Sequence, residues 1–236
     1  MLQGLAVALL IGVDLIAGES TAVRPAGVVE TYTVIAERQN GRLRGASMEV
    51  EIEASLPKLK KHGRLSALRR ISDLGRITYE KIHFEGDKSI ENEVIARYLA
   101  ADAEAETSNP GARAISPANY RFKYKGERDD RGRPLYVFQL TPIKKRVGLF
   151  RGELWLDANT CLPVREAGRM VKNPSIFLKR IDFVREYEIR DGVAIPHEIA
   201  STVDTRLVGK AELIVRFQNI SLAEYPVSSI ATATGQ

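Results

Sequence analysis

Apolar and polar residues alternate along much of this chain. Over residues 150–157, Phe and Leu alternate with Arg, Glu and Asp, which is typical of a strand with one buried and one solvated face. The sequence Asp157-Ala158-Asn159-Thr160 follows, and Asp and Asn stabilise turns by bonding their own backbone. The pattern therefore predicts a β-hairpin over 150–165. Trp155 and Asp157 fall on the face opposite Phe150, so we expect them on the outer face or supporting the turn.

The same kind of pattern predicts strands elsewhere, because β-branched and aromatic residues favour a pleated, half-buried surface. Asn40-Gly41 predicts a tight hairpin turn between the first two of these strands. Residues 65–71 fit either a strand or a helix. The further predicted strands are Val29–Arg38, Met48–Ala54, Arg76–Phe84, Tyr120–Lys125, Leu135–Thr141, Ile181–Ile189, Val193–Val203 and Ala211–Ile220.

One segment has helical spacing instead. Asp87 or Ser89 can cap a helix that runs to about Glu106, with apolar residues at helical spacing between them. Strands joined by turns, with one inserted helix, predict a mainly β (α+β) fold. We expect a strongly curved antiparallel sheet that forms an open or half β-barrel, with at least one amphipathic helix covering it.

Composition adds a mild basic bias. The chain has 236 residues, a net charge of +5 and a pI of about 9.3. Basic residues gather in 58–70 and 144–151, which suits either an anionic membrane surface or protection of exposed strand edges. Nucleic acid is not expected as a partner, because the aromatic residues fall on inward positions. With one cysteine, Cys161, no internal disulfide can form.

The first residues resemble an export signal. Leu5–Val13 is an apolar run too short to cross a membrane, and it fits the core of a secretory signal. No Lys or Arg precedes it and Asp14 interrupts it, so a cytoplasmic extension is the alternative. We predict a signal-like segment at 1–22 and a periplasmic or otherwise exported protein.

No reaction is indicated by the sequence. His62, His83 and His197 lie on separate segments, and nucleophile elbows, phosphate-binding loops and dinucleotide fingerprints are absent from the sequence. We therefore predict no catalytic residues, no metal and no cofactor. An enzyme would need a cleft that brings His197 or His83 together with two carboxylates.

The strongest positive feature is a row of apolar side chains on one strand face. A wide curved sheet with little helical cover leaves an apolar concavity of the kind that binds lipid, whereas an ordinary dry core is the alternative. The candidate ligand-binding residues are Tyr120, Phe122, Phe138, Phe150, Leu154, Phe183, Tyr187 and Phe217.

The segment LTPIKKRVGLFRGELWLDANTCLPVRE, from Leu140 to Glu166, resembles the lipoprotein-carrier superfamily of the bacterial envelope (LolA/LolB and RseB-like, outer membrane lipoprotein-sorting proteins). Leu140-Thr141-Pro142 and the hairpin Trp155–Pro163 carry the resemblance, and IDFVREYEIRDGVAIPHEI resembles the hairpin that follows in that superfamily. The resemblance implies one LolA-like open β-barrel domain over 23–236. It also implies binding of lipid acyl chains or a lipoprotein without catalysis. A protein-interaction or sensor domain without lipid cargo is the alternative.

Overall fold

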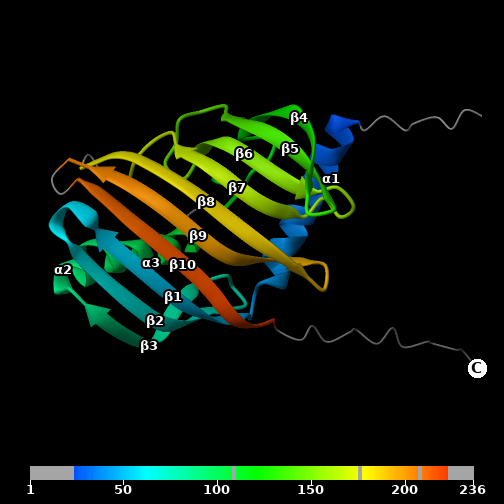
Figure 1. Cartoon of the computed structure of the whole chain (residues 1–236). Coiled ribbons are helices and arrows are strands. Elements are labelled where there is room, and N and C mark those ends of the chain that lie inside the picture. Colours follow the sequence, from blue (N-terminus) through cyan, green and yellow to red (C-terminus); the bar gives the residue numbers. More distant parts are fainter. Residues whose placement is uncertain (1–23, 108–109, 175–176, 207–208, 223–236) are drawn as a thin grey trace, which may run out of the picture.

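The computed structural model describes residues 24–107, 110–174, 177–206 and 209–222, so the signal-like segment lies outside the described residues. The described residues form ten strands in one antiparallel sheet whose two edge strands, β3 and β4, do not meet (Figure 1). The predicted open, curved antiparallel sheet is therefore confirmed. In sheet order the strands are β3 (Ile77–Gly86), β2 (Lys61–Ile71), β1 (Ser47–Leu56), β10 (Lys210–Ser221), β9 (Val193–Thr205), β8 (Leu178–Arg190), β7 (Pro163–Met170), β6 (Phe150–Asp157), β5 (Arg133–Pro142) and β4 (Tyr120–Asp130).

The predicted helix is confirmed and lies on the concave face of the sheet (Figure 1). It comprises α2 (Lys88–Ile90), a π-helical stretch η2 (Glu91–Ile95) and α3 (Ala96–Thr107). The Asp87 side chain caps it by accepting a 3.0 Å hydrogen bond from the Ser89 N–H. Short 3₁₀ helices complete the helical elements, η1 (Pro57–Leu59) and η3 (Pro110–Ala112).

The strand predicted at Val29–Arg38 is wrong. Residues Pro25–Arg42 form a second helix, α1, and Asn40-Gly41 lies in its last turn instead of a hairpin. Pro25 suits a helix start because its missing N–H would have no partner there. The Thr31 and Thr33 hydroxyls donate to carbonyls four residues earlier, at 2.9 and 2.8 Å, which accommodates residues that usually favour strands.

Two hydrophobic clusters fill the concave side. The first lies beneath α2, η2 and α3 and is built from β1, β2 and β10. The second lies beneath α1 and is built mainly from β4, β5, β6 and β8. The ambiguous segment 65–71 belongs to strand β2, since Leu65 and Ala67 point into the first cluster while their neighbours are exposed or only partly buried.

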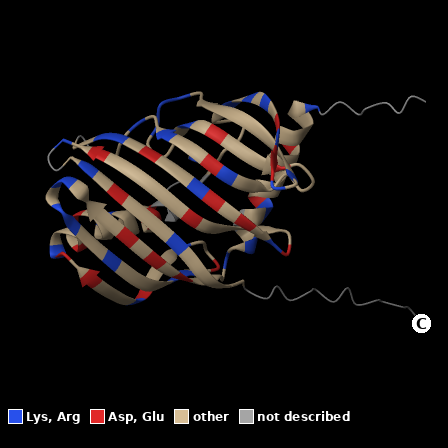
Figure 2. Ribbon diagram, in the orientation of Figure 1, with Lys and Arg blue, Asp and Glu red and all other residues tan. Residues whose placement is uncertain are grey.

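The convex face is charged. Figure 2 shows Lys and Arg alternating with Asp and Glu across this face, and cross-strand ion pairs connect neighbouring strands. Arg216 on β10 bonds both Glu198 on β9 at 3.1 Å and Glu53 on β1 at 3.3 Å. One face of the sheet is thus dry beneath helices and the other is mostly polar, which explains the alternation in much of the sequence.

Candidate functional site

An aromatic cluster lines the concave face beneath α1. The ring of Phe150 on β6 lies 4.9 Å from that of Phe183 on β8 and 5.8 Å from that of Tyr120 on β4, centroid to centroid. Phe138 on β5 contacts Tyr124 and Phe122 at 5.3 and 6.2 Å. Edge-on and tilted rings at these distances attract, and the four strands contribute these rings to one hydrophobic cluster.

The structure divides the eight candidate residues between three settings. Phe217 belongs to the other cluster, beneath α3. Tyr187 is only partly buried and joins a polar group, described below. The remaining candidates lie together beneath α1, all of them fully buried except Phe122: Tyr120, Phe122, Phe138, Phe150, Leu154 and Phe183.

Few contacts hold α1 over the aromatic cluster. Among its described side chains, only Val29 and Tyr32 are buried, while Val34 is 49% exposed. Among the described residues, no side chain caps its N-terminus. Near its C-terminus, Gln39 accepts from the Ala194 N–H at 2.9 Å and donates to the Gly192 carbonyl at 3.0 Å. The helix is therefore a light cover, held by hydrogen bonds at its C-terminal end and by Val29 and Tyr32 in its N-terminal half.

A polar group interrupts the apolar concave face. The Glu166 side chain on β7 is 6% exposed and accepts from Arg185 at 3.0 Å and from the Tyr187 hydroxyl at 2.8 Å, both on β8. Burial and the Glu166 charge raise the pKa of Tyr187, so its hydroxyl remains a donor. Burial and the same carboxylate also raise the pKa of Tyr32 on α1. By its strand register the group lies beside Leu154 and Phe183 of the aromatic cluster.

The second helical cover is anchored more firmly than α1. Asp102 on α3 accepts from Arg69 of β2 at 3.0 Å and from the Tyr79 hydroxyl of β3 at 2.6 Å. Ile90 and Ile95 on the same helical segment are 0% exposed. Of the two covers on the concave face, α1 is therefore the one that needs less free energy to displace.

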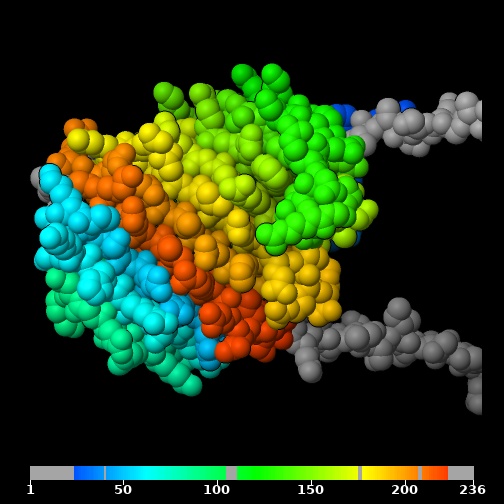
Figure 3. Space-filling view, viewed as in Figure 1, coloured from blue at the N-terminus to red at the C-terminus, as the bar shows by residue number. Residues whose placement is uncertain are grey.

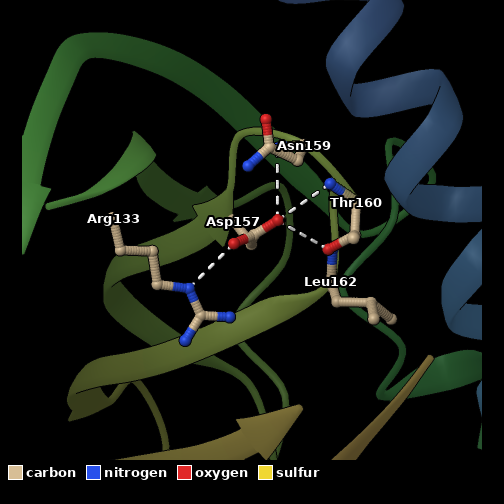
Figure 4. Close-up of polar contacts among 5 residues, drawn as sticks. All are labelled: Arg133, Asp157, Asn159, Thr160 and Leu162. Atoms are coloured by element: carbon tan, nitrogen blue, oxygen red, sulfur yellow. Dashed lines mark hydrogen bonds and ion pairs between the residues drawn. The ribbon is translucent and has the colours of Figure 1, made fainter. Parts of the chain in front are cut away.

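The turn between β6 and β7 is organised by one carboxylate (Figure 4). Asp157 Oδ1 accepts from the Asn159 N–H at 3.1 Å and from the Thr160 N–H and hydroxyl, each at 2.8 Å. Its Oδ2 accepts from Arg133 Nε on β5 at 2.8 Å. The expectation that Asp157 supports the turn is confirmed, and its side chain also connects this turn to β5 without facing the aromatic cluster.

Replacing Asp157 by Asn should lower the free energy of unfolding by about 1–2 kcal/mol at pH 7, because a charge-assisted bond to Arg133 is lost. Burial opposes ionisation, but the bonds from Arg133 and Thr160 outweigh it and lower the pKa of Asp157. A lowered folded-state pKa stabilises the protein above the unfolded pKa of about 4, and this stability is lost as pH falls through the folded value. Urea unfolding at several pH values measures the difference.

The matched control is Asp129→Asn. Asp129 caps the exposed β4–β5 turn by accepting from the Gly132 N–H at 2.8 Å, so its replacement should cost less. The gap between Asp157→Asn and the parent should begin to narrow below about pH 4, where the unfolded carboxyl becomes protonated, and should close only as pH falls through the lowered folded-state pKa. A gap that is constant with pH would contradict the role of the ionised carboxylate.

A groove of about 870 Å³ lies on the convex side. In Figure 3 the β4–β5 hairpin (green) overhangs this face beside β8. His197 lines the groove together with Glu186 and Glu188, so a histidine and two carboxylates do share a cleft. His197 is exposed, and no hydrogen bond or ion pair joins it to either carboxylate among the described residues. The groove therefore offers a mixed-charge surface and no positioned acid–base pair.

The other features relevant to chemistry are few. His83 contacts Glu85 at 3.2 Å with both side chains exposed. Across the described ranges, no three His, Cys, Asp or Glu side chains are grouped so that they could hold a metal ion. None of the described helices combines the length and apolar character that a bilayer crossing requires.

The sequence did not point to Glu166 and Arg185. Both occupy inward positions, since Glu166 is paired in register with the buried Leu154 and Arg185 follows Phe183 by two residues. A charged residue at an inward position of an alternating strand was the available signal. It was hidden because β7 has few large apolar residues to set its alternation.

Comparison with known proteins finds solved structures of low sequence identity. No family model and no curated protein matches the sequence. Similar solved structures include a LolA superfamily protein of Nitrosomonas europaea, which is 13% identical, with 87% of this chain and 96% of that chain covered and a TM-score of 0.41.

Two further structures come from other bacteria. A Vibrio parahaemolyticus domain described as an outer membrane lipoprotein-sorting protein is 12% identical, with 85% of this chain and 95% of that chain covered and a TM-score of 0.43. MucB in its complex with MucA from Pseudomonas aeruginosa is 12% identical, with coverages of 82% and 99% and a TM-score of 0.27.

Proposed function

We propose that this chain is an exported, non-enzymatic protein that binds a hydrophobic ligand, either lipid acyl chains or a lipidated peptide, on the concave face beneath α1. One observation carries the proposal: an aromatic surface built from four strands is covered by a helix with only two buried side chains among those described, Val29 and Tyr32. Displacing the helix would expose a large apolar surface, and an acyl chain would rebury it.

The anchoring of α1 supports a cover that opens. Its fixed end is held by Gln39 at the β8–β9 turn, while its uncapped N-terminal end carries Val29 and Tyr32. Movement about the Gln39 end would uncover Phe150 and Phe183 without separating strands. The polar group around Glu166 lies at the border of this surface, where the head of an amphiphile would reach it.

Shortening Val29 to alanine should increase uptake of the fluorescent fatty acid cis-parinaric acid. Removing two buried methyl groups weakens the closed position of α1 by about 1.4 kcal/mol, which is about tenfold in apparent affinity. Titration of purified protein with the probe measures the change. Val34→Ala on the same helix is the matched control, because Val34 is 49% exposed and its loss should leave uptake unchanged.

The two functions predicted from the sequence give different results in this titration. A ligand site beneath α1 gives saturable uptake by the parent and tighter uptake by Val29→Ala. An interaction or sensor domain without lipid cargo gives no saturable uptake by either protein, and that result would overturn the proposal.

A further inference from the structure

One end of the sheet carries a basic rim formed by five loops. Because strands alternate in direction, the same end holds the β1–β2 turn, the start of α2, the β5–β6 loop, the β7–β8 loop and the β9–β10 turn. Figure 2 shows Lys and Arg at the turns along this end. The cations of the basic rim are Lys58, Lys60, Lys61, Lys88, Lys144, Lys145, Arg146, Lys172, Lys179, Arg180, Arg206 and Lys210.

The five loops form one continuous surface, because each contacts the next. Backbone hydrogen bonds or side-chain contacts join every neighbouring pair. Three of the contacts are backbone hydrogen bonds: Asp87 N–H to the His62 carbonyl at 3.0 Å, Arg206 N–H to the Phe177 carbonyl at 2.9 Å, and Val171 N–H to the Leu149 carbonyl at 3.0 Å. The fourth is a side-chain contact of Lys58 with Gly209, where the Lys58 Cδ would lie 3.4 Å from a Cβ added to the glycine.

Part of the positive charge of the rim is compensated, because Lys88 pairs with Glu91 and Arg180 with Asp182 in the elements that adjoin the loops. In the described parts of these loops, Asp87 is the one acidic residue, and it pairs with Lys61 at 3.4 Å. Lys60, Lys144 and Lys145 are exposed and take part in none of the ion pairs of the described residues. At these three lysines an anionic partner would therefore meet no competing carboxylate of the described residues.

Apolar side chains project between these cations. Phe177 is 50% exposed, Leu59 and Ile143 are each 45% exposed and Val147 is 39% exposed, and all four lie in the rim loops. The opposite end of the sheet differs. Its 72–76 turn holds Leu74, 92% exposed, between Asp73 and Arg76, and there acidic and basic residues occur together.

We propose that the basic rim docks on an anionic lipid bilayer, with its cations against the headgroups and its apolar loop tips in the interfacial region. Cations adjacent to a negatively charged bilayer are attracted to it, and exposed apolar side chains gain from entering the headgroup–acyl boundary. An acidic protein would satisfy the lysines but would leave Phe177 and Ile143 without an apolar environment. This docking surface is separate from the ligand site proposed beneath α1.

The test is cosedimentation of the full chain with vesicles of phosphatidylcholine containing 30% phosphatidylglycerol, compared with pure phosphatidylcholine. Lys60→Glu, Lys144→Glu and Lys145→Glu together should lower binding to the anionic vesicles about 100-fold, since each cation contributes about fivefold. Arg44→Glu, Arg76→Glu and Arg131→Glu form the matched control, because they change net charge equally at exposed positions of the opposite end.

Phe177→Ser with Val147→Ser tests the apolar tips separately. This pair should weaken the binding that persists in 0.5 M NaCl, where headgroup attraction is screened. Any contribution of the N-terminal apolar run is shared by all variants. Equal circular dichroism and thermal unfolding show that each variant is folded.

Two results would overturn the proposal. The first is parent protein that does not prefer anionic vesicles, which would favour an acidic protein as the partner of the rim. The second is an equal loss of binding in the rim and control triples, which would show a response to net charge alone.

Discussion

Replacing Gly152 by alanine is expected to lower the free energy of unfolding by at least about 3 kcal/mol, or to prevent folding. Gly152 on β6 is paired with Gly168 on β7. A Cβ at position 152 would lie 1.9 Å from the Ala167 carbonyl oxygen and 2.5 Å from the Gly168 Cα. These are backbone atoms, so no side-chain rotation relieves the overlap, and the two strands would have to separate.

Thermal unfolding and soluble yield measure this effect, with Gly27→Ala as the matched control. Gly27 lies in the first turn of α1, and nothing lies within 4 Å of an added Cβ there. Because glycine is unfavourable in a helix, alanine should leave stability unchanged or raise it slightly. If Gly152→Ala melts at the parent temperature, the close approach of β6 and β7 is not essential to the sheet.

Removal of the Glu166 carboxylate is expected to cost about 3 kcal/mol. Glu166→Ala leaves the Arg185 guanidinium and the Tyr187 hydroxyl without the buried acceptor that both now share. Breaking a buried pair on one side costs more than the pair contributes, because the remaining charge stays poorly solvated. The figure is at the low end of the usual range since the Arg185 side chain is 37% exposed. Guanidinium unfolding measures it.

Two further variants make the result specific. Glu166→Leu combined with Arg185→Met removes both charges and should recover most of the lost stability. Glu186→Ala, on the opposite face of β8, removes a carboxylate that lies 4.0 Å from Arg165 and is 53% exposed, so it should cost little. A Glu166→Ala protein as stable as Glu186→Ala would mean that the concave polar group contributes nothing to folding.

Strand alternation was a reliable guide wherever one face is dry and the other is charged. Met48–Ala54 follows this rule, with every second residue buried against a helix and the rest in ion pairs or water. The rule failed for Val29–Arg38, which is helical, because its valine, threonine and tyrosine residues favour strands in general. The helical signal was present in the spacing of Val29, Tyr32 and Ala36, all of which face the second cluster, and in Pro25.

The candidate site was predictable in part for the same reason. Periodicity identifies which residues of a strand share a face, so Phe150, Leu154 and Phe183 could be grouped before any coordinates were known. It does not determine which helix covers each part of a wide sheet. Phe217 was therefore grouped with residues beneath α1, although it packs beneath α3. The pairing of Glu166 with Arg185 depends on the register of β7 and β8, which no local pattern encodes.

The pairing of β1 with β10 also constrains the order in which the chain can fold. Val50 lies opposite Phe217 and Ile52 opposite Val215, so the earliest strand completes its core with the latest one. Strands β1 to β3 and strands β4 to β10 can each pair with their sequence neighbours as they emerge during synthesis, whereas the second edge of β1 must wait for the last strand. A nascent chain that ends before Lys210 would leave the apolar residues of its N-terminal core exposed. These residues would be a binding site for chaperones.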